Sequence, residues 1–273
     1  MLLREVADMA QYKIETHLHT AEGSKCGWAT GSEQAEARLM DGYSTIIVTD
    51  HFFRGNTRPE RSLPWEEYIE QFCSGYEHAK ARGDEIGITV LFGLEDNYQG
   101  SEFLIYGLDK DWLLKHPDMR TWTPWEEYEH VHGDGGYMVQ AHPFREASYL
   151  RGFGLYPMYT DAVEGINAAQ TKAMNERAIW YAKQFDKPMT AGSDIHGIDS
   201  VGGGIIAPHP INTIWDYINM IRNREPYELI EKHRDEKPQG GPPGPDFFKM
   251  IEQKKVEMKA FADEAARRIH EGQ

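Results

Sequence analysis

Hydrophobic residues along the chain form short apolar runs, separated by longer segments in which apolar and polar positions alternate with a helical period. The apolar runs are rich in β-branched residues and typical of buried strands. We expect strands at residues 12–17, 43–50, 86–95, 102–108, 137–144, 161–168 and 187–194. The amphipathic segments predict helices at residues 32–42, 65–83, 123–135, 171–186, 213–223 and 224–233. Ser32 is the expected N-cap of the first helix.

The alternation of strands and helices predicts βαβ units and a parallel sheet. About seven such strands favour a closed α/β barrel over an open doubly wound sheet. Neither a Gly-x-Gly-x-x-Gly motif after the first strand nor a P-loop is present to support a nucleotide-binding open sheet. The chain has 273 residues, a length that one such barrel can use. We therefore expect a single barrel over residues 1–235.

A break in composition follows the expected barrel. Residues 236–246 are dominated by proline and glycine and predict a linker. Residues 247–273 follow as one predicted helix, with apolar positions that suit a single packing face. We expect this appended helix to dock on the barrel or on another subunit, which would make a homo-oligomer.

The net charge limits the binding partners to expect, and the cysteine content indicates the cellular compartment. The net charge of −15 argues against long nucleic acids and anionic membranes, because phosphate groups are held by basic surfaces. The two cysteines, Cys26 and Cys73, form no disulfide framework, so a reducing compartment is expected. No signal-peptide core and no apolar run of about 18–20 residues is present. These features predict a cytoplasmic protein that does not cross a membrane.

Histidines and carboxylates stand at the C-terminal ends of the predicted strands. In chain order they are His17, His19, Asp50, His51, Glu95, His142, Asp194 and His196. Active sites of α/β barrels assemble at this edge, so these side chains should converge. Imidazole with carboxylate suits zinc, manganese or iron, and so many ligands suit two or three ions that share a carboxylate and a hydroxide. Asp50 should point away from His51 and orient a ligand.

The motifs HLHT, TDH, GLE, AHPFR and GSDIH, in this order, resemble those of the PHP (polymerase and histidinol phosphatase) superfamily. The resemblance runs from about residue 12 to about residue 206. It implies a distorted (β/α)7 barrel, a centre of two or three metals, and phosphoester hydrolysis by a metal-bridging hydroxide. By position, His17, His19, Glu95 and Asp194 would share one part of the cluster, which His51, His142 and His196 would complete.

The chain departs from the family pattern in two places. Many members carry an acid or a histidine five or six residues after the second histidine, where this chain has Ser24 and Lys25. Glu22 or Cys26 could substitute there. Many members also carry a histidine where this chain has Glu102, which is a candidate replacement ligand. We therefore expect two metals, with a third as the alternative.

The expected function is hydrolysis of a small phosphomonoester or nucleotide. Arg145 lies three residues after His142, and its guanidinium would hold phosphate oxygens. Lys25 and Arg54, in the first two rim loops, are further candidates for this role, and His196 or His142 could protonate the leaving oxygen. The alternatives are an exonuclease or cyclic-phosphodiester hydrolase, a non-catalytic metal-binding accessory protein, and hydrolysis of C–N or C–O bonds.

Overall fold

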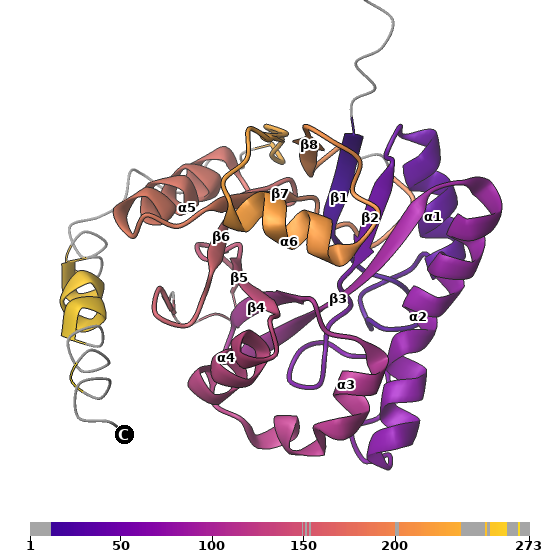
Figure 1. The fold of residues 1–273 in the computed structure, drawn as a ribbon, viewed down its shortest axis with the longest axis horizontal. Coiled ribbons are helices and arrows are strands. Elements are labelled where there is room, and N and C mark those ends of the chain that lie inside the picture. The colour runs from indigo at the N-terminus through magenta and orange to yellow at the C-terminus, as the bar shows by residue number, and fades with distance from the viewer. Residues whose placement is uncertain are drawn as a thin grey trace, which may run out of the picture.

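One mixed sheet lies at the centre of the computed structural model, which describes residues 12–148, 150, 152, 154–199, 202–235, 249, 252–260 and 267. Its nine strands follow the order β7-β6-β5-β4-β3-β2-β1-β8-β9 (Figure 1). The strands are β1 (Tyr12–Leu18), β2 (Thr45–Val48), β3 (Thr89–Tyr98), β4 (Ser101–Tyr106), β5 (Tyr137–Ala141), β6 (Ala162–Asn167), β7 (Met189–Gly192), β8 (Ile205–Ala207) and β9 (Glu228–Leu229).

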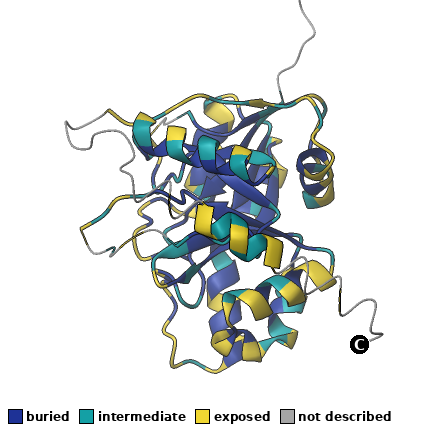
Figure 2. Cartoon of the chain, turned by 90° about the vertical axis from the view of Figure 1, so that its left-hand side faces the viewer, coloured by how far each residue is buried: buried dark blue, intermediate teal, exposed yellow. Residues whose placement is uncertain are grey.

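Helices surround this sheet, with their exposed residues turned outward and the buried residues concentrated in the strands (Figure 2). They are α1 (Gly31–Met40), α2 (Trp65–Ile86), α3 (Lys110–Lys115), the 3-10 helix Pro117–Thr121, α4 (Pro124–Gly133), α5 (Lys172–Gln184) and α6 (Ile214–Arg222). Within the described residues, none of the helices combines the length and the apolar character that a bilayer crossing requires.

Helix α1 begins at a different residue from the one expected. Its N-cap is Thr30, whose hydroxyl accepts a hydrogen bond from the backbone N–H of Glu33, and the Glu33 carboxylate accepts the Thr30 N–H in return. This reciprocal capping box satisfies two backbone donors at once. The expectation of Ser32 as the cap is therefore wrong by two positions.

The sheet nearly closes on itself, because the end of β1 meets the segment after β7. The Asp194 N–H donates to the His17 carbonyl at 2.9 Å, and the His19 N–H donates to the Ile195 carbonyl at 2.9 Å. The Thr16 hydroxyl donates to the Ala191 carbonyl at 2.7 Å. These contacts confirm the expected distorted barrel and bring the first and last ligand-bearing strands together.

Strand β4 runs antiparallel to both β3 and β5, which departs from the expected parallel sheet. A tight turn causes this reversal, with Gln99 and Gly100 at φ values of 55° and 95°. Positive φ is readily adopted by glycine, so this turn needs Gly100. The start of β4 consequently lies at the same edge of the sheet as the end of β3. Glu102 is thereby paired with Asn97 and with Ala141 in the sheet.

Residues 224–233 form no helix, contrary to expectation. Helix α6 ends at its cap Asn223, and Pro226 disfavours a helical conformation at the residue before it. The chain instead forms β9, which pairs antiparallel with β8, and β8 pairs antiparallel with β1. Both strands are too short to show the alternation of apolar and polar residues that identifies a strand in the sequence.

The segment after the barrel is described only in part. The predicted linker 236–246 lies outside the described residues, and of the predicted helix 247–273 the structure describes residues 249, 252–260 and 267. Met258 packs against a buried apolar cluster that includes Phe144 and Tyr181. The Lys255 ammonium donates to the Gln184 side chain of α5 at 2.9 Å. A homo-oligomer formed through this helix stays a prediction.

Close packing of α2 on the segment that follows β1 generates a prediction at Gly75. A Cβ on Gly75 would lie 2.1 Å from the Thr20 hydroxyl, which donates to the Asp50 carboxylate at 2.6 Å. We expect Gly75→Ala to lower the free energy of unfolding by about 1–3 kcal/mol through overpacking, as measured by urea denaturation. Gly133→Ala is the matched control, because no atom lies within 4 Å of its added Cβ. Equal midpoints for the two variants would contradict the packing argument.

Candidate metal centre

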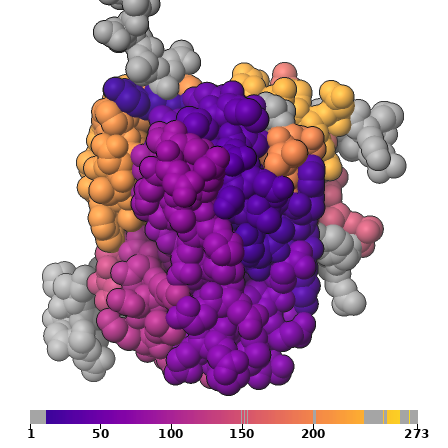
Figure 3. Space-filling view, turned by 90° about the vertical axis from the view of Figure 1, so that its right-hand side faces the viewer, coloured from indigo at the N-terminus to yellow at the C-terminus, as the bar shows by residue number. Residues whose placement is uncertain are grey.

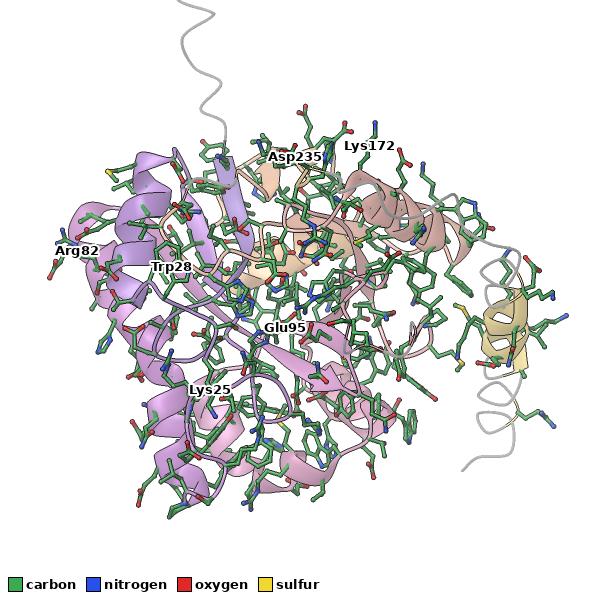
Figure 4. All side chains as sticks on the ribbon, turned by 180° about the vertical axis from the view of Figure 1, so that it is seen from behind. Lys25, Trp28, Arg82, Glu95, Lys172 and Asp235 are labelled. Atoms are coloured by element: carbon green, nitrogen blue, oxygen red, sulfur yellow. The ribbon has the colours of Figure 1, made fainter. Side chains whose placement is uncertain are left out.

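The candidate ligands lie at one edge of the barrel, most of them where a strand ends or begins. His17 lies in β1 and His19 directly follows it; His51 follows β2, and His142 follows β5. Glu95 lies within the long strand β3, in the interior of the molecule (Figure 4). Asp194 and His196 follow β7, and Glu102 enters from the start of the reversed strand β4. The structure thus brings together all eight residues predicted as metal ligands.

Glu95 is the centre of this group. Its Oε1 lies 3.3 Å from His17 Nε2 and 3.2 Å from His142 Nε2. Its Oε2 lies 2.7 Å from His51 Nδ1 and 3.5 Å from His19 Nε2. One carboxylate therefore faces four imidazoles, two on each oxygen, which is the arrangement of a ligand that bridges two ions.

Asp194 closes the group from the side of β7. Its Oδ1 lies 3.3 Å from His19 Nε2 and 3.6 Å from His17 Nε2, and its Oδ2 lies 3.8 Å from His142 Nε2. The side chains define four overlapping sets with ligand atoms within 4.8 Å of one another. The sets are His19/His51/His196, His17/Glu95/His142, His17/His19/Asp194 and His51/Glu95/Glu102. Because the sets share members, the cluster suits more than one ion.

The residues fit divalent metals. His51 Nδ1, His142 Nε2 and both Glu95 oxygens are buried without a hydrogen-bond partner. Burying such atoms unpaired is costly, and it is relieved when they coordinate a cation. Ligand atoms bound at about 2.0–2.2 Å from one ion are roughly 3–3.5 Å apart. The distances from the Glu95 oxygens to His17, His142 and His19 lie in this range, and that to His51 is shorter. Nitrogen and oxygen donors together suit transition ions.

Electrostatics keep the central carboxylate ionised. Burial raises the pKa of Glu95, but His17 and His51 outweigh it and hold the pKa well below its usual value. Burial and the neighbouring His51 and His196 hold the pKa of His19 well below its usual value. Burial lowers the pKa of His17 and of His51, but Glu164 and Glu95 raise the pKa of His17, and Glu95 raises that of His51, well above the usual value. A metal ion that binds these two rings must therefore displace their protons.

Glu164, on β6, holds two of the ligands in place. Its Oε1 lies 2.9 Å from His17 Nδ1, and its Oε2 accepts the backbone N–H of His142 at 2.9 Å. The Asn167 amide donates to the same Oε2 at 2.9 Å. Carboxylates behind metal-bound imidazoles fix the ring orientation and tautomer. Sequence reasoning missed Glu164; the available signal was an acid inside an otherwise apolar strand.

Asp50 acts on His19 through Ser24. The Ser24 hydroxyl lies 3.1 Å from His19 Nδ1 and donates to Asp50 Oδ1 at 2.7 Å. Asp50 also accepts the backbone N–H of Thr20 at 2.7 Å. The expected orienting role of Asp50 thus has a geometric basis, with Ser24 as the intermediary.

The structure separates the two residues proposed to replace the missing acid or histidine. Glu22 accepts the backbone N–H of Gly31 at 3.1 Å and lies 3.0 Å from His78 Nδ1, at the start of α1. Cys26 instead lies beside His51 and His196. Burial raises the pKa of its thiol, but hydrogen bonding to His196 and His51 outweighs burial and lowers the pKa to about 6. Cys26 is therefore the better placed of the two to approach a metal.

A cavity of about 410 Å³ opens over the cluster. It is lined by Cys26, His51, Arg54, Gly55, Asn56, Asn97, Glu102, Arg145, Asp194 and His196. A larger groove of about 650 Å³ lies between α2, the start of β3 and the start of α6. Figure 3 shows the surface of α2 (purple) beside α6 (orange). None of the four ligand sets found among the described residues lines that groove, so the smaller cavity is the candidate site.

The three predicted phosphate-binding side chains differ in position. Arg145 lines the cavity and its Nη1 donates to Glu102 Oε2 at 2.9 Å. The Arg54 guanidinium binds the Asp96 carboxylate and the Met119 and Trp122 carbonyls, which weighs against a role on substrate. Lys25 is exposed and is not among the residues that line the cavity. All three roles stay predictions, and Arg145 is the best placed.

Comparison with known proteins gives evidence on the family and the fold of this chain. Residues 172–226 match a family described as PHP-associated. A two-domain protein from Bacteroides vulgatus, described as containing a predicted PHP-like metal-dependent phosphoesterase, superimposes with a TM-score of 0.59 at 14% identity, over 78% of this chain and 63% of that one. This chain thus spans less than two thirds of that protein. No curated protein matches the sequence.

Two further structures share the fold. PsfC from Pseudomonas syringae superimposes with a TM-score of 0.51 at 17% identity, over 77% of this chain and 88% of that one. An amidohydrolase from Chromobacterium violaceum, with bound sulfate and no metal, superimposes with a TM-score of 0.50 at 14% identity, over 76% of this chain and 96% of that one. At these identities the likeness shows the fold. Together with the PHP-associated segment, it confirms the resemblance of this chain to the PHP superfamily.

The contacts of Glu164 predict that it controls metal affinity. We expect Glu164→Gln to weaken zinc binding by roughly 10–100-fold, because the neutral amide holds His17 less firmly as a ligand. Competition with a chromophoric chelator measures this affinity. Glu146→Gln is the control, because its carboxylate pairs with Arg177. Unchanged zinc affinity in Glu164→Gln would show that Glu164 merely fills space.

Proposed function

We propose that this protein is a metal-dependent phosphoesterase that hydrolyses small phosphomonoesters. The observation that carries the proposal is the buried cluster around Glu95, whose unpaired donor atoms lie beneath an open cavity that Arg145 lines. The fold shared with a protein described as containing a PHP-like metal-dependent phosphoesterase supports it. The size of the cavity, about 410 Å³, suits a small ligand.

Seven residues would hold the metals. They are His17, His19, His51, Glu95, Glu102, His142 and Asp194. Divalent ions in this position supply a nucleophile from water at neutral pH and neutralise charge that develops on phosphoryl oxygens. The cluster suits zinc, manganese or iron. Glu95 would be shared between two ions, because each of its oxygens faces a different pair of histidines.

Arg145 would bind the phosphoryl group. Its hydrogen bond to Glu102 fixes the side chain at the edge of the cluster. A guanidinium offers several donors in one plane, and these match two oxygens of a phosphate. An anion held there would face the metal ligands, which is the orientation that the chemistry requires.

His196 would protonate the leaving oxygen. It lines the cavity, whereas His142 is nearly fully buried. The His196 Nδ1 lies 2.8 Å from the carbonyl of Asp194, which places a proton on Nδ1 and leaves Nε2 to exchange one with substrate. This assignment requires that His196 does not coordinate an ion, and it therefore belongs with a centre of two metals.

The net charge favours a small monoester over a polymer. At −15, the chain offers little attraction to a long phosphate backbone. An exonuclease or cyclic-diester hydrolase would use the same metals and is distinguished by its substrates. A non-catalytic accessory protein would bind metal without turnover, and an amidohydrolase would cleave C–N bonds instead.

Substrate choice tests the proposal. We expect the manganese-loaded protein to hydrolyse p-nitrophenyl phosphate faster than bis-p-nitrophenyl phosphate, and to leave p-nitroacetanilide intact. We expect Asp194→Ala to lower kcat at least a hundredfold, on the order seen when metal chemistry is lost. His209→Ala is the control, because His209 is bound to Glu225 outside the cluster. Diester or anilide cleavage without monoesterase activity would refute the proposal.

A series of leaving groups tests the role of His196. General acid catalysis matters most when the leaving alcohol is a poor one. We expect His196→Gln to lower kcat/KM for an alkyl phosphate by roughly 10²–10⁴-fold and for p-nitrophenyl phosphate by much less. Metal content measured on the same preparation serves as the control. A uniform loss across the series, or loss of metal, would place His196 among the ligands.

A further inference from the structure

A large aromatic side chain lies exposed at the rim of the candidate site. Trp28 is 59% exposed, and Ile198, next in the chain to the glycine on which Trp28 packs, is 52% exposed. Trp28 is the most exposed tryptophan of the described residues, ahead of Trp215 at 43% and Trp125 at 38%, and it is the one bound to the segment that carries His196. Figure 4 labels Trp28 together with Glu95 and Lys25.

The indole is held in a fixed position. The backbone N–H of Trp28 donates to the carbonyl of His196 at 2.9 Å. The ring lies against Gly197, where an added Cβ would come within 1.9 Å of the indole carbons. The Arg58 guanidinium binds the carbonyls of Ser24 and Gly27 and so ties down the loop that carries Trp28.

The position of the indole links it to the cavity. Trp28 lies two residues after Cys26, and Gly197 directly follows His196; both Cys26 and His196 line the cavity over the metal ligands. A group that leaves phosphorus and accepts its proton from His196 must lie on this side of the cavity. Trp28 is not itself among the residues that line the cavity, so its indole can contact only a part of the substrate that extends out of the cavity past His196. That part is the leaving group rather than the phosphoryl group.

We propose that Trp28 is the stacking platform for a flat aromatic or heteroaromatic ring carried by the leaving group of the substrate. The proposal rests on the proposed function, because it takes the phosphoryl group to lie at the metal cluster. Aromatic rings stack on tryptophan with an offset geometry that saturated rings of the same size do not reproduce.

The exposed area suits a ring better than a protein partner. One tryptophan offers at most about 250 Å². A specific protein interface buries about 800 Å² on each partner. Lys25, close to Trp28 in the chain, is exposed and polar, so the apolar surface does not extend in that direction. A single aromatic ring would cover the apolar surface that Trp28 exposes.

Binding of two matched ligands tests the platform. Naphthalen-2-ylmethyl phosphonate and its decahydronaphthalene counterpart carry the same anion and carbon skeleton, and neither can be hydrolysed as an ester. Calorimetry on the full-length, manganese-loaded protein should show tighter binding of the aromatic phosphonate. We expect Trp28→Ala to weaken it by roughly tenfold or more, with binding of the saturated ligand unchanged, and Trp28→Phe to keep part of the preference.

Trp215→Ala is the matched control, because Trp215 is 43% exposed and lines the larger groove instead. Equal binding of the two phosphonates, an equal loss of both in Trp28→Ala, or no binding of either would overturn the platform. Turnover of the corresponding phosphate esters is measured separately. Ring-selective binding without turnover would contradict the proposed phosphoesterase activity but not the stacking of a ring on Trp28. Turnover without ring selectivity would contradict the stacking role of Trp28 but not the phosphoesterase activity.

Discussion

The burial of Glu95 between four histidines is the constraint on which the site depends. A carboxylate taken out of water needs compensating charge or hydrogen-bond donors, or its burial destabilises the fold. Both Glu95 oxygens face imidazole nitrogens, yet neither oxygen receives a hydrogen bond. A cation between these groups would provide the missing compensation. Metal binding and folding stability should therefore be coupled in this protein.

A second layer of contacts keeps the ligands from rearranging. Glu164 holds His17 and the backbone of His142, and Asp50 acts on His19 through Ser24. His142 and Asp194 have φ values of 22° and 56°, a conformation that costs about 1–3 kcal/mol for a residue other than glycine. The hydrogen bonds around them hold this strained geometry. Contacts within the protein thus fix the positions of the candidate ligands, as a preorganised site requires.

The strands and the rim loops have different roles in the candidate site. The strands set the ligand positions, and the reversal of β4 adds Glu102, which fixes Arg145 at the edge of the cavity. The rim loops decide what the cavity can accept. Arg54 also lines the cavity, but its guanidinium is held by Asp96 and two backbone carbonyls. Trp28 shows the opposite case, a side chain that the same rim leaves open to a ligand.

The local sequence was enough to predict the barrel and to bring most of the candidate ligands to one edge, because most of them follow or end a predicted apolar strand and that signal lies in neighbouring residues. Glu102, at the start of β4, was proposed from the family pattern instead. The local sequence could not predict the direction of β4, which depends on the turn at Gln99 and Gly100, nor strands as short as β8 and β9. Glu164 has a role only once His17 lies against it, 147 positions earlier in the chain. Glu22 and Cys26 were equivalent candidates until the packing of their loop turned one toward α1 and the other toward His51 and His196. The spacing of apolar residues along the chain shows which face of a segment is buried, and it can be read from neighbouring residues. Contacts between segments that are distant in the sequence exist only after the barrel closes.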